Sequence, residues 1–140
     1  MTENLFVTLP ADHPLAGRSS VTFAELDGGS VLLYAAIGFW RGVCERMMPS
    51  TRFLVQEDRG VFERLLTPTA PPYFITDAPA LAASPASLGS RSVVPITDAS
   101  AHATFYLLVR EDRGGEAVEV FDWVRAQRAW RGGAVVRPRA

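Results

Sequence analysis

Apolar residues are grouped along this chain in short runs, and segments with helical periodicity separate the runs. Each run is rich in β-branched or aromatic residues and is bounded by Pro, Gly or charged residues, a pattern that predicts strands. The predicted strands cover residues 5–9, 31–34, 52–56, 73–76, 92–96 and 104–110.

Between the strands, apolar residues recur three and four positions apart, as they do on the buried face of a helix. One such stripe is wide and consists of two adjacent rows, and Thr22 and Glu25 have the spacing of a capping box at a helix start. The residues of the stripe are Phe39, Trp40, Val43, Cys44, Met47 and Met48. The predicted helices are 23–26, 39–48, the segment from the Asp58 cap to Leu66, a broken helix over 78–89, and 116–130 with the stripe Ala117, Val120, Phe121 and Val124.

The alternation of strands and helices determines the expected fold class. The connecting units are too long for hairpins, which favours parallel pairing through right-handed crossovers. We therefore expect an α/β fold with a three-layer, mostly parallel twisted sheet and helices on both faces. The 140 residues suit one ordinary domain. We expect a single α/β domain over 1–131, followed by a flexible C-terminal tail over 132–140.

The composition is that of an ordinary globular protein, with 48% apolar residues, 21% charged residues and a net charge of −1. These values exclude a disordered chain, a coiled coil and a strongly basic nucleic-acid binder. The single cysteine, Cys44, excludes an internal disulfide and fits a reducing compartment, so we expect the cytoplasm. Neither a signal-peptide pattern nor an apolar run of ~18 residues is present, so we expect neither export nor a membrane partner.

Residues that could carry catalysis do not form a recognisable constellation. His13 and His102 lie far apart in sequence, and the HExxH, GxSxG and P-loop patterns are absent. Cys44 lies in the apolar stripe of its helix, where a thiol is usually packing. The acidic segments 56–58 and 111–113 are typical of turns and helix caps. We therefore expect no enzyme, no metal and no cofactor.

A more specific pattern lies within residues 5–34, "LFVTLPADHPLAGRSSVTFAELDGGSVLLY". A strand is followed by "DHPLA" at 12–16 and by the order S-V-T-x-x-x-L from Ser20 to Leu26. This order resembles a segment of LysR-type transcriptional regulators. In that family a strand leaves the first effector subdomain, passes a "DHPLA" loop and enters the second subdomain through a short helix.

The resemblance continues toward the C-terminus. Residues 93–113 resemble the strand that crosses back, and 116–130 resemble the last helix of the family. Over residues 5–130 it covers only half of a usual member, without the winged helix-turn-helix and most of the first effector subdomain. The chain departs from the family at 67–76, "TPTAPPYFIT", where members commonly have a Gly-rich stretch.

The resemblance implies one lobe of a type 2 periplasmic-binding-protein-like fold, with the effector in a cleft between two α/β subdomains. Open α/β sheets bind ligands outside the carboxyl ends of their strands, where the N-terminus of the next helix attracts anions. Such positions follow the predicted strands 31–34 and 73–76. The implied ligand-binding residues are Ala36, Ile37, Gly38, Phe39, Trp40, Arg41, Thr76 and Asp77.

These residue types suit an anionic organic ligand. Gly38 allows close approach to the backbone, and Arg41 can pair with a carboxylate. Phe39 and Trp40 would form flat apolar walls of a cleft. Because both belong to the stripe of their helix, packing against the sheet is the alternative. Asp77 is either a ligand residue or a helix cap.

Two functions follow from these expectations. The first, implied by the resemblance, is a non-catalytic module that binds a small, anionic organic effector and makes no direct contact with DNA. The second is a dimerisation or protein-interaction module, the remnant of a longer regulator with no ligand of its own. There, a homodimer or a missing partner lobe would cover the strand edges and apolar faces that half of a two-lobed fold exposes.

Overall fold

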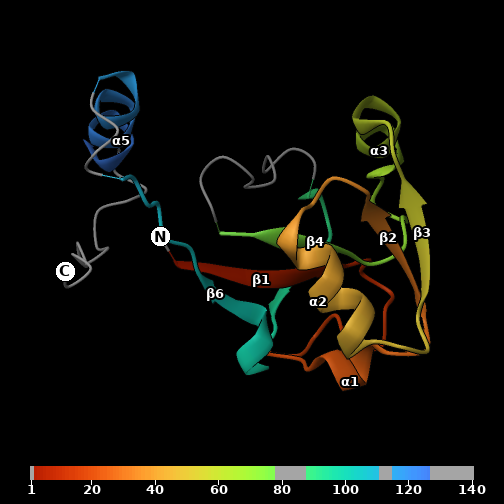
Figure 1. The fold of residues 1–140 in the computed structure, drawn as a ribbon. Helices are drawn as coiled ribbons and strands as arrows, with labels where there is room; N and C mark the ends of the chain where they lie inside the picture. The colour runs from red at the N-terminus through yellow and green to blue at the C-terminus, as the bar shows by residue number, and fades with distance from the viewer. Residues whose placement is uncertain (1, 78–87, 111–114, 127–140) are drawn as a thin grey trace. The chain divides into compact units, whose positions relative to one another are not determined.

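A computed structural model describes residues 2–77, 88–110 and 115–126. The chain divides into a larger unit, Asn4–His102, and a smaller unit, Met1–Glu3 with Ala103–Ala140. The elements (Figure 1) are β1 (Thr2–Leu9), α1 (Phe23–Leu26), β2 (Ser30–Tyr34), α2 (Phe39–Met47), β3 (Arg52–Gln56), α3 (Arg59–Leu65), β4 (Tyr73–Thr76), β5 (Ser92–Pro95), the 3₁₀ turn η1 (Ala99–Ala101), β6 (His102–Thr104) and α5 (Glu116–Ala126).

The strands form one mixed sheet in the order β3-β2-β4-β1-β5, and β6 also pairs with β1. β2 runs parallel to β3 and β4, whereas β1 runs antiparallel to β4 and β5. Strands β2 to β5 therefore share one direction and β1 opposes them. The expected α/β class is confirmed. The sheet was predicted to be mostly parallel: β2 to β5 share one direction as expected, and β1 is the antiparallel strand that makes the sheet mixed.

Helices cover both faces of the sheet in the larger unit. Tyr73 and Phe74 are neighbours in β4, so their side chains point to opposite faces. The Tyr73 ring lies 6.4 Å from the ring of Phe62 in α3, and the Phe74 ring lies 6.3 Å from that of Phe23 in α1. Since α2 contacts α1, these two helices share one face and α3 covers the other (Figure 1).

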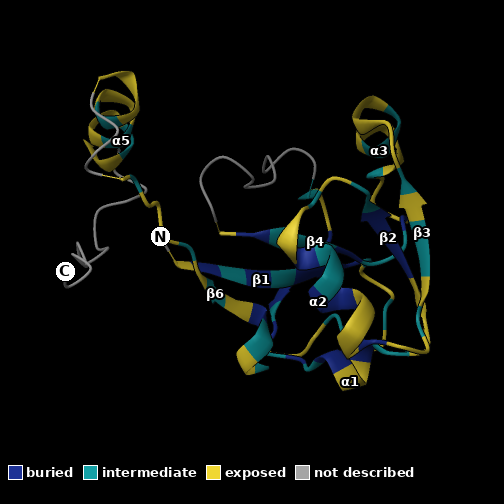
Figure 2. Cartoon of the chain, viewed as in Figure 1, coloured by how far each residue is buried: buried dark blue, intermediate teal, exposed yellow. Residues whose placement is uncertain are grey.

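Burial follows the predicted pattern in β2 but only in part in α2, where Val43 is buried while Phe39 and Met47 are exposed (Figure 2). β2 buries three consecutive residues, Val31, Leu32 and Leu33, as a strand covered on both faces must. The sheet-facing side of α2 buries Trp40, Val43 and Cys44. The core of the larger unit therefore includes both faces of β2 and the sheet-facing side of α2, and it continues along β1, where Leu5, Val7 and Leu9 are buried.

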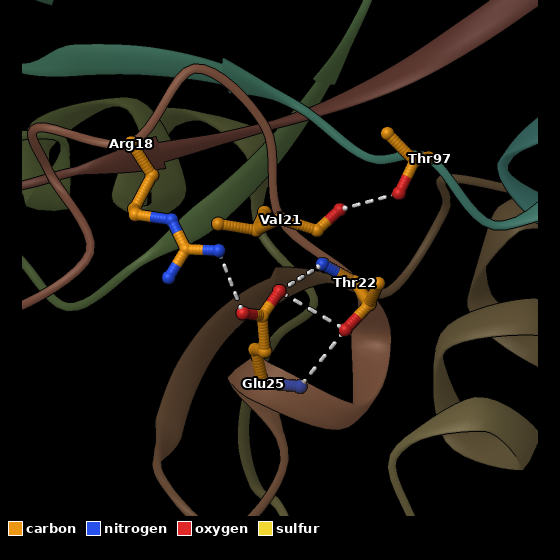
Figure 3. Close-up of polar contacts among 5 residues, drawn as sticks. All are labelled: Arg18, Val21, Thr22, Glu25 and Thr97. Atoms are coloured by element: carbon orange, nitrogen blue, oxygen red, sulfur yellow. Dashed lines mark hydrogen bonds and ion pairs between the residues drawn. The ribbon is translucent and has the colours of Figure 1, made fainter.

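The S-V-T segment fastens α1 to the edge of the sheet (Figure 3). Thr22 Oγ1 accepts a hydrogen bond from Glu25 N at 3.3 Å, and the Glu25 carboxylate accepts one from Thr22 N at 2.8 Å. This is the predicted capping box, and these bonds lower the pKa of Glu25. Thr97 Oγ1 donates to the Val21 carbonyl at 3.3 Å, next to a parallel bridge between Val21 and Ile96. The segment that carries the family resemblance thus pairs with the end of β5.

Arg91 organises the proline-rich loop before β4. Its side chain is buried, with 6% of the residue exposed, and its guanidinium lies 4.7 Å from the centre of the Tyr73 ring. Pro68, Pro71 and Pro72 have no N–H, so the loop has few backbone donors of its own, one of which is Ala70 N, which donates to the Thr67 carbonyl at 3.1 Å. The guanidinium donates to the carbonyl oxygens of Thr67 (3.1 Å), Pro68 (3.3 Å), Ala70 (2.8 Å), Pro71 (3.0 Å) and Thr8 (3.1 Å), and to Thr8 Oγ1 (3.4 Å).

Of the predictions toward the C-terminus, one is wrong and the others lie wholly or partly outside the described residues. The strand predicted over 104–110 is wrong, because β6 ends at Thr104. Residues 105–110 have strand-forming side chains, but they pair with no described strand, and a strand forms only within a ladder. The broken helix predicted over 78–89 lies largely outside the described residues, as do 127–130 of the last predicted helix and the predicted tail over 132–140.

His13 in the "DHPLA" loop accepts a hydrogen bond at Nδ1 from Leu15 N at 3.2 Å. The pKa of His13 is lowered, first by burial and then by the positive charge of Arg91, while Asp12 acts in the opposite direction. The folded protein therefore holds His13 in its neutral form, with Nδ1 as an acceptor.

We predict that Arg91→Met destabilises the protein by about 3 kcal/mol or more, because it leaves several buried carbonyl groups without donors. Urea unfolding measures the change. The control is Arg59→Met, which removes an exposed ion pair with Glu63 and costs about 0.5 kcal/mol or less. Equal losses in the two variants would contradict the role of Arg91.

We also predict that stability falls as the pH drops below the ordinary histidine pKa of about 6.5. The unfolded chain takes up a proton on His13 there, while the folded protein does not until its lowered pKa is reached. The loss then levels off. His13→Asn keeps an acceptor for Leu15 N and cannot be protonated. Its unfolding free energy, measured in urea from pH 7.5 to 5, should fall less steeply than that of the wild type.

Candidate functional site

The two segments predicted to bind a ligand lie at the same edge of the sheet. β2 ends at Tyr34 and β4 ends at Thr76, and the two strands pair in parallel through Leu32 and Tyr73. The chain leaves β2 toward β3 and leaves β4 toward β5, on opposite sides. Ligands of open α/β sheets bind where strand order diverges in this way. The tertiary structure thus brings residues 36–41 and 76–77 to one edge.

Gly38 forms the turn between β2 and α2. It is the N-cap of α2, with φ 64° and ψ −130°, and no side chain caps the helix. A positive φ favours glycine over every other residue. Ile37 before it is half-buried and Ala36 is exposed. The turn therefore leaves the first turn of α2 open toward this edge, without a side chain at the cap.

Phe39 and Trp40 have different environments. Trp40 is 3% exposed and belongs to the core, whereas Phe39 is 54% exposed. Their rings lie 5.2 Å apart in an edge-on arrangement, with an interplanar angle of 71°. The helical stripe that both share thus directs Trp40 inward, and Phe39 is the ring that a molecule at the helix start would meet.

Arg41 lies in the first turn of α2, half-buried along its stem. Its Nε donates to Glu45 Oε1 at 2.9 Å, one helical turn further on. Exposed pairs of this kind contribute about 0.3–0.5 kcal/mol. The guanidinium is therefore held only weakly beside the helix N-terminus.

Thr76 and Asp77 end β4 with opposite orientations. Thr76 is buried, while Asp77 is exposed and both of its carboxylate oxygens accept hydrogen bonds from Asn4 in β1. The distances are 2.8 Å from Asn4 N and 2.6 Å from Asn4 Nδ2. Asn4 Oδ1 lies 2.7 Å from His102 Nδ1. In the described structure the Asp77 carboxylate joins the end of β4 to β1, and the helix that it was predicted to cap lies largely outside the described residues.

Asn4, His102 and Arg91 were not among the residues predicted to form the site or to shape its surroundings. Asn4 and His102 lie about a hundred positions apart, and the pairing of β1 with β4 and β6 is what brings Asn4 to Asp77 and His102 to Asn4. A histidine after "DASA" is the only local signal, and it carries no information about its partner.

A separate apolar groove lies on the face that α3 covers. It contains none of the predicted ligand residues, and its single polar lining residue is Gln56. The groove is lined by Leu32, Leu54, Val55, Gln56, Leu65 and Pro71.

Two further polar residues of the larger unit, Cys44 and Asp58, have structural roles. Cys44 is buried, and burial raises the pKa of its thiol to about 12, so the predicted packing role is confirmed. Asp58 caps α3 by accepting from Val61 N at 2.7 Å, as the acidic segment predicted. Within the described ranges, no three His, Cys, Asp or Glu side chains are grouped as metal ligands would be. No described helix has the length and apolar character needed to cross a membrane.

Comparisons with known proteins give matches only at the level of structure. Neither a family model nor a curated protein sequence matches the chain. The reduced OxyR regulatory domain from Pseudomonas aeruginosa is similar with a TM-score of 0.51 and 17% identity, over 72% of this chain and 50% of that one. Full-length OxyR from the same organism is similar with a TM-score of 0.53 and 17% identity, over 73% of this chain and 33% of that one.

The chain thus spans half the length of the regulatory domain that it matches. At 17% identity the likeness concerns the fold. The chain therefore has the α/β fold found in part of the OxyR regulatory domain.

Proposed function

We propose that this chain is a non-catalytic module that binds a small, anionic organic molecule at the carboxyl edge of β2 and β4. The observation that carries the proposal is that residues 36–41 and 76–77 follow two neighbouring parallel strands at the same edge of the sheet, where the strand order diverges. The similarity to the OxyR regulatory domain supports a role in transcription regulation. We also propose that the protein is cytoplasmic and that this chain makes no direct contact with DNA.

The chemistry at this edge favours a carboxylate attached to an apolar body. The N-terminus of α2 carries the positive end of the helix dipole, and Gly38 leaves it without a side-chain cap. Arg41 adds a full positive charge in the same turn, and the exposed ring of Phe39 offers apolar contact. A small aromatic or aliphatic carboxylate fits these groups.

We predict that a compound from a panel of small carboxylates, with benzoate and succinate as the first two, raises the melting temperature of the full chain. A ligand at a hundred times its Kd stabilises by about 2.7 kcal/mol. Calorimetric titration should show at least tenfold weaker binding for Arg41→Ala, because the charge at the helix start is lost.

The matched control is Arg46→Ala in the last turn of α2, at the opposite end of the helix from Gly38 and Arg41. Its affinity should stay within about twofold of the wild type, because this charge lies away from the helix start. A panel that stabilises nothing, or equal losses in both variants, would contradict the proposal.

A second candidate function is protein association, and the smaller unit favours it. None of the residues of α5 is buried (Figure 2), although the helix carries the stripe that the sequence predicted. Leu108 is 83% exposed and Trp123 is 66% exposed. Apolar surface of this kind marks interaction sites. An open groove in this unit is lined by Leu107, Leu108, Val109, Glu116, Ala117, Val120 and Phe121.

We propose that a second copy or a partner lobe covers this surface. Size-exclusion chromatography with light scattering should show association that grows with concentration, and Leu108→Asp should weaken it at least tenfold. Leu65→Asp, at an apolar residue of the larger unit that is 43% exposed, is the control and should leave association unchanged. A monomer at every concentration would argue against homodimerisation through this surface.

A further inference from the structure

Three polar side chains meet at the point where the chain enters and leaves the larger unit. Asn4 is the first residue of that unit and His102 is the last. Their side chains are joined, with Asn4 Oδ1 and His102 Nδ1 2.7 Å apart, and Asn4 is joined in turn to Asp77. We call Asn4, Asp77 and His102 the junction cluster; all three belong to the larger unit.

The hydrogen bonds assign the chemical state of each member. The Asp77 carboxylate only accepts, so the Asn4 amide nitrogen donates to it and the Asn4 oxygen faces His102. His102 Nδ1 must therefore carry a hydrogen and donate to Asn4 Oδ1. Asp77 N also donates to the Asn4 carbonyl at 3.3 Å. One carboxylate thus orients a chain of bonds across β4, β1 and β6.

A comparable bond lies on the other side of the junction. Thr2 and Thr104, both in the smaller unit, have their hydroxyl oxygens 3.3 Å apart. That bond joins the same two strands without reaching β4. The junction cluster differs because it connects both strands to Asp77, the residue that follows β4 at the candidate ligand edge.

We propose that the junction cluster is a positioning device that fixes the entry and exit strands of the larger unit to the end of β4. Asp77 is its anchor, Asn4 bridges it to His102, and His102 holds the strand that leaves. Loss of the anchor leaves the pairing of β1 with β4 from Leu5 onward in place, but it removes the side-chain link that holds Asn4, and through Asn4 also His102, to the end of β4.

The cluster also couples the candidate ligand site to the strands that enter and leave the larger unit. This extension rests on the function proposed above. A ligand at the edge of β2 and β4 lies beside Thr76 and Asp77, so it acts on the cluster through the end of β4. Displacement of the Asp77 carboxylate would alter the hydrogen bonds of Asn4 and His102. The ligand edge and the two connecting strands are thereby coupled.

The test is ¹⁵N relaxation of the full chain. In the wild type the amides of residues 2–4 and 102–104 should have order parameters near those of a rigid strand, about 0.85. Asn4→Ala removes both side-chain bonds, and Asp77→Asn puts an amide where the carboxylate accepts. Both variants should lower these values toward the flexible range, below about 0.6, with Val31 to Leu33 in β2 unchanged.

Thr104→Val is the control, since it removes only the bond to Thr2. It should leave the amides of Asn4, Asp77 and His102 as they are in the wild type. Unchanged order parameters in both Asn4→Ala and Asp77→Asn would overturn the positioning role. Because all three cluster residues are at least partly exposed, the variants are expected to fold, and the β2 amides report whether they do.

The coupling has its own measurement. A carboxylate that raises the melting temperature should shift the amide resonances of Asn4 and His102 in the wild type, and this shift should be lost in Asp77→Asn. A compound that binds without moving them overturns the coupling and leaves the proposed function standing. A panel in which nothing binds overturns both, whereas the relaxation data still decide the positioning role.

Discussion

The larger unit depends on one buried guanidinium. The loop before β4 is rich in proline, which has no N–H, so the loop has few backbone donors for its own carbonyl oxygens. Arg91 supplies the missing donors from the start of β5, and its position over Tyr73 joins the loop to the central strands. The charge has no carboxylate among its hydrogen-bond acceptors, which are five carbonyl groups and the hydroxyl of Thr8. The place of β4, and with it the candidate ligand edge, follows from this contact.

The direction of β1 determines which residues lie beside the carboxyl end of β4. Four strands share one direction, and β1 runs against them between β4 and β5. Its N-terminal end therefore lies beside the carboxyl end of β4, where Asn4 meets Asp77. If β1 ran parallel to β4, Asn4 would lie at the opposite edge. An antiparallel strand is thus what places the entry and exit of the larger unit at the same edge as the candidate ligand residues.

The sequence predicted local structure well where the signal was local. The Thr22 and Glu25 capping box, the Asp58 cap and the strand 52–56 depend on neighbouring residues only, and each is confirmed. The candidate site was predicted as two segments, because the end of a strand is visible in a sequence. That Trp40 turns inward and Phe39 outward was left open, since both occupy one helical stripe. The strand at 104–110 was predicted wrongly, because β propensity says nothing about a partner strand.

The sequence by itself determined the α/β class, most element boundaries and the order of segments that resembles LysR-type regulators, since periodicity, capping and motif order are properties of nearby residues. Only the tertiary structure decided which distant residues meet: Arg91 with the loop at 67–71, Asn4 with Asp77, and His102 with Asn4. These contacts join positions that are between about twenty and a hundred residues apart. Pairing and register of strands set them, and neither is encoded in the local pattern.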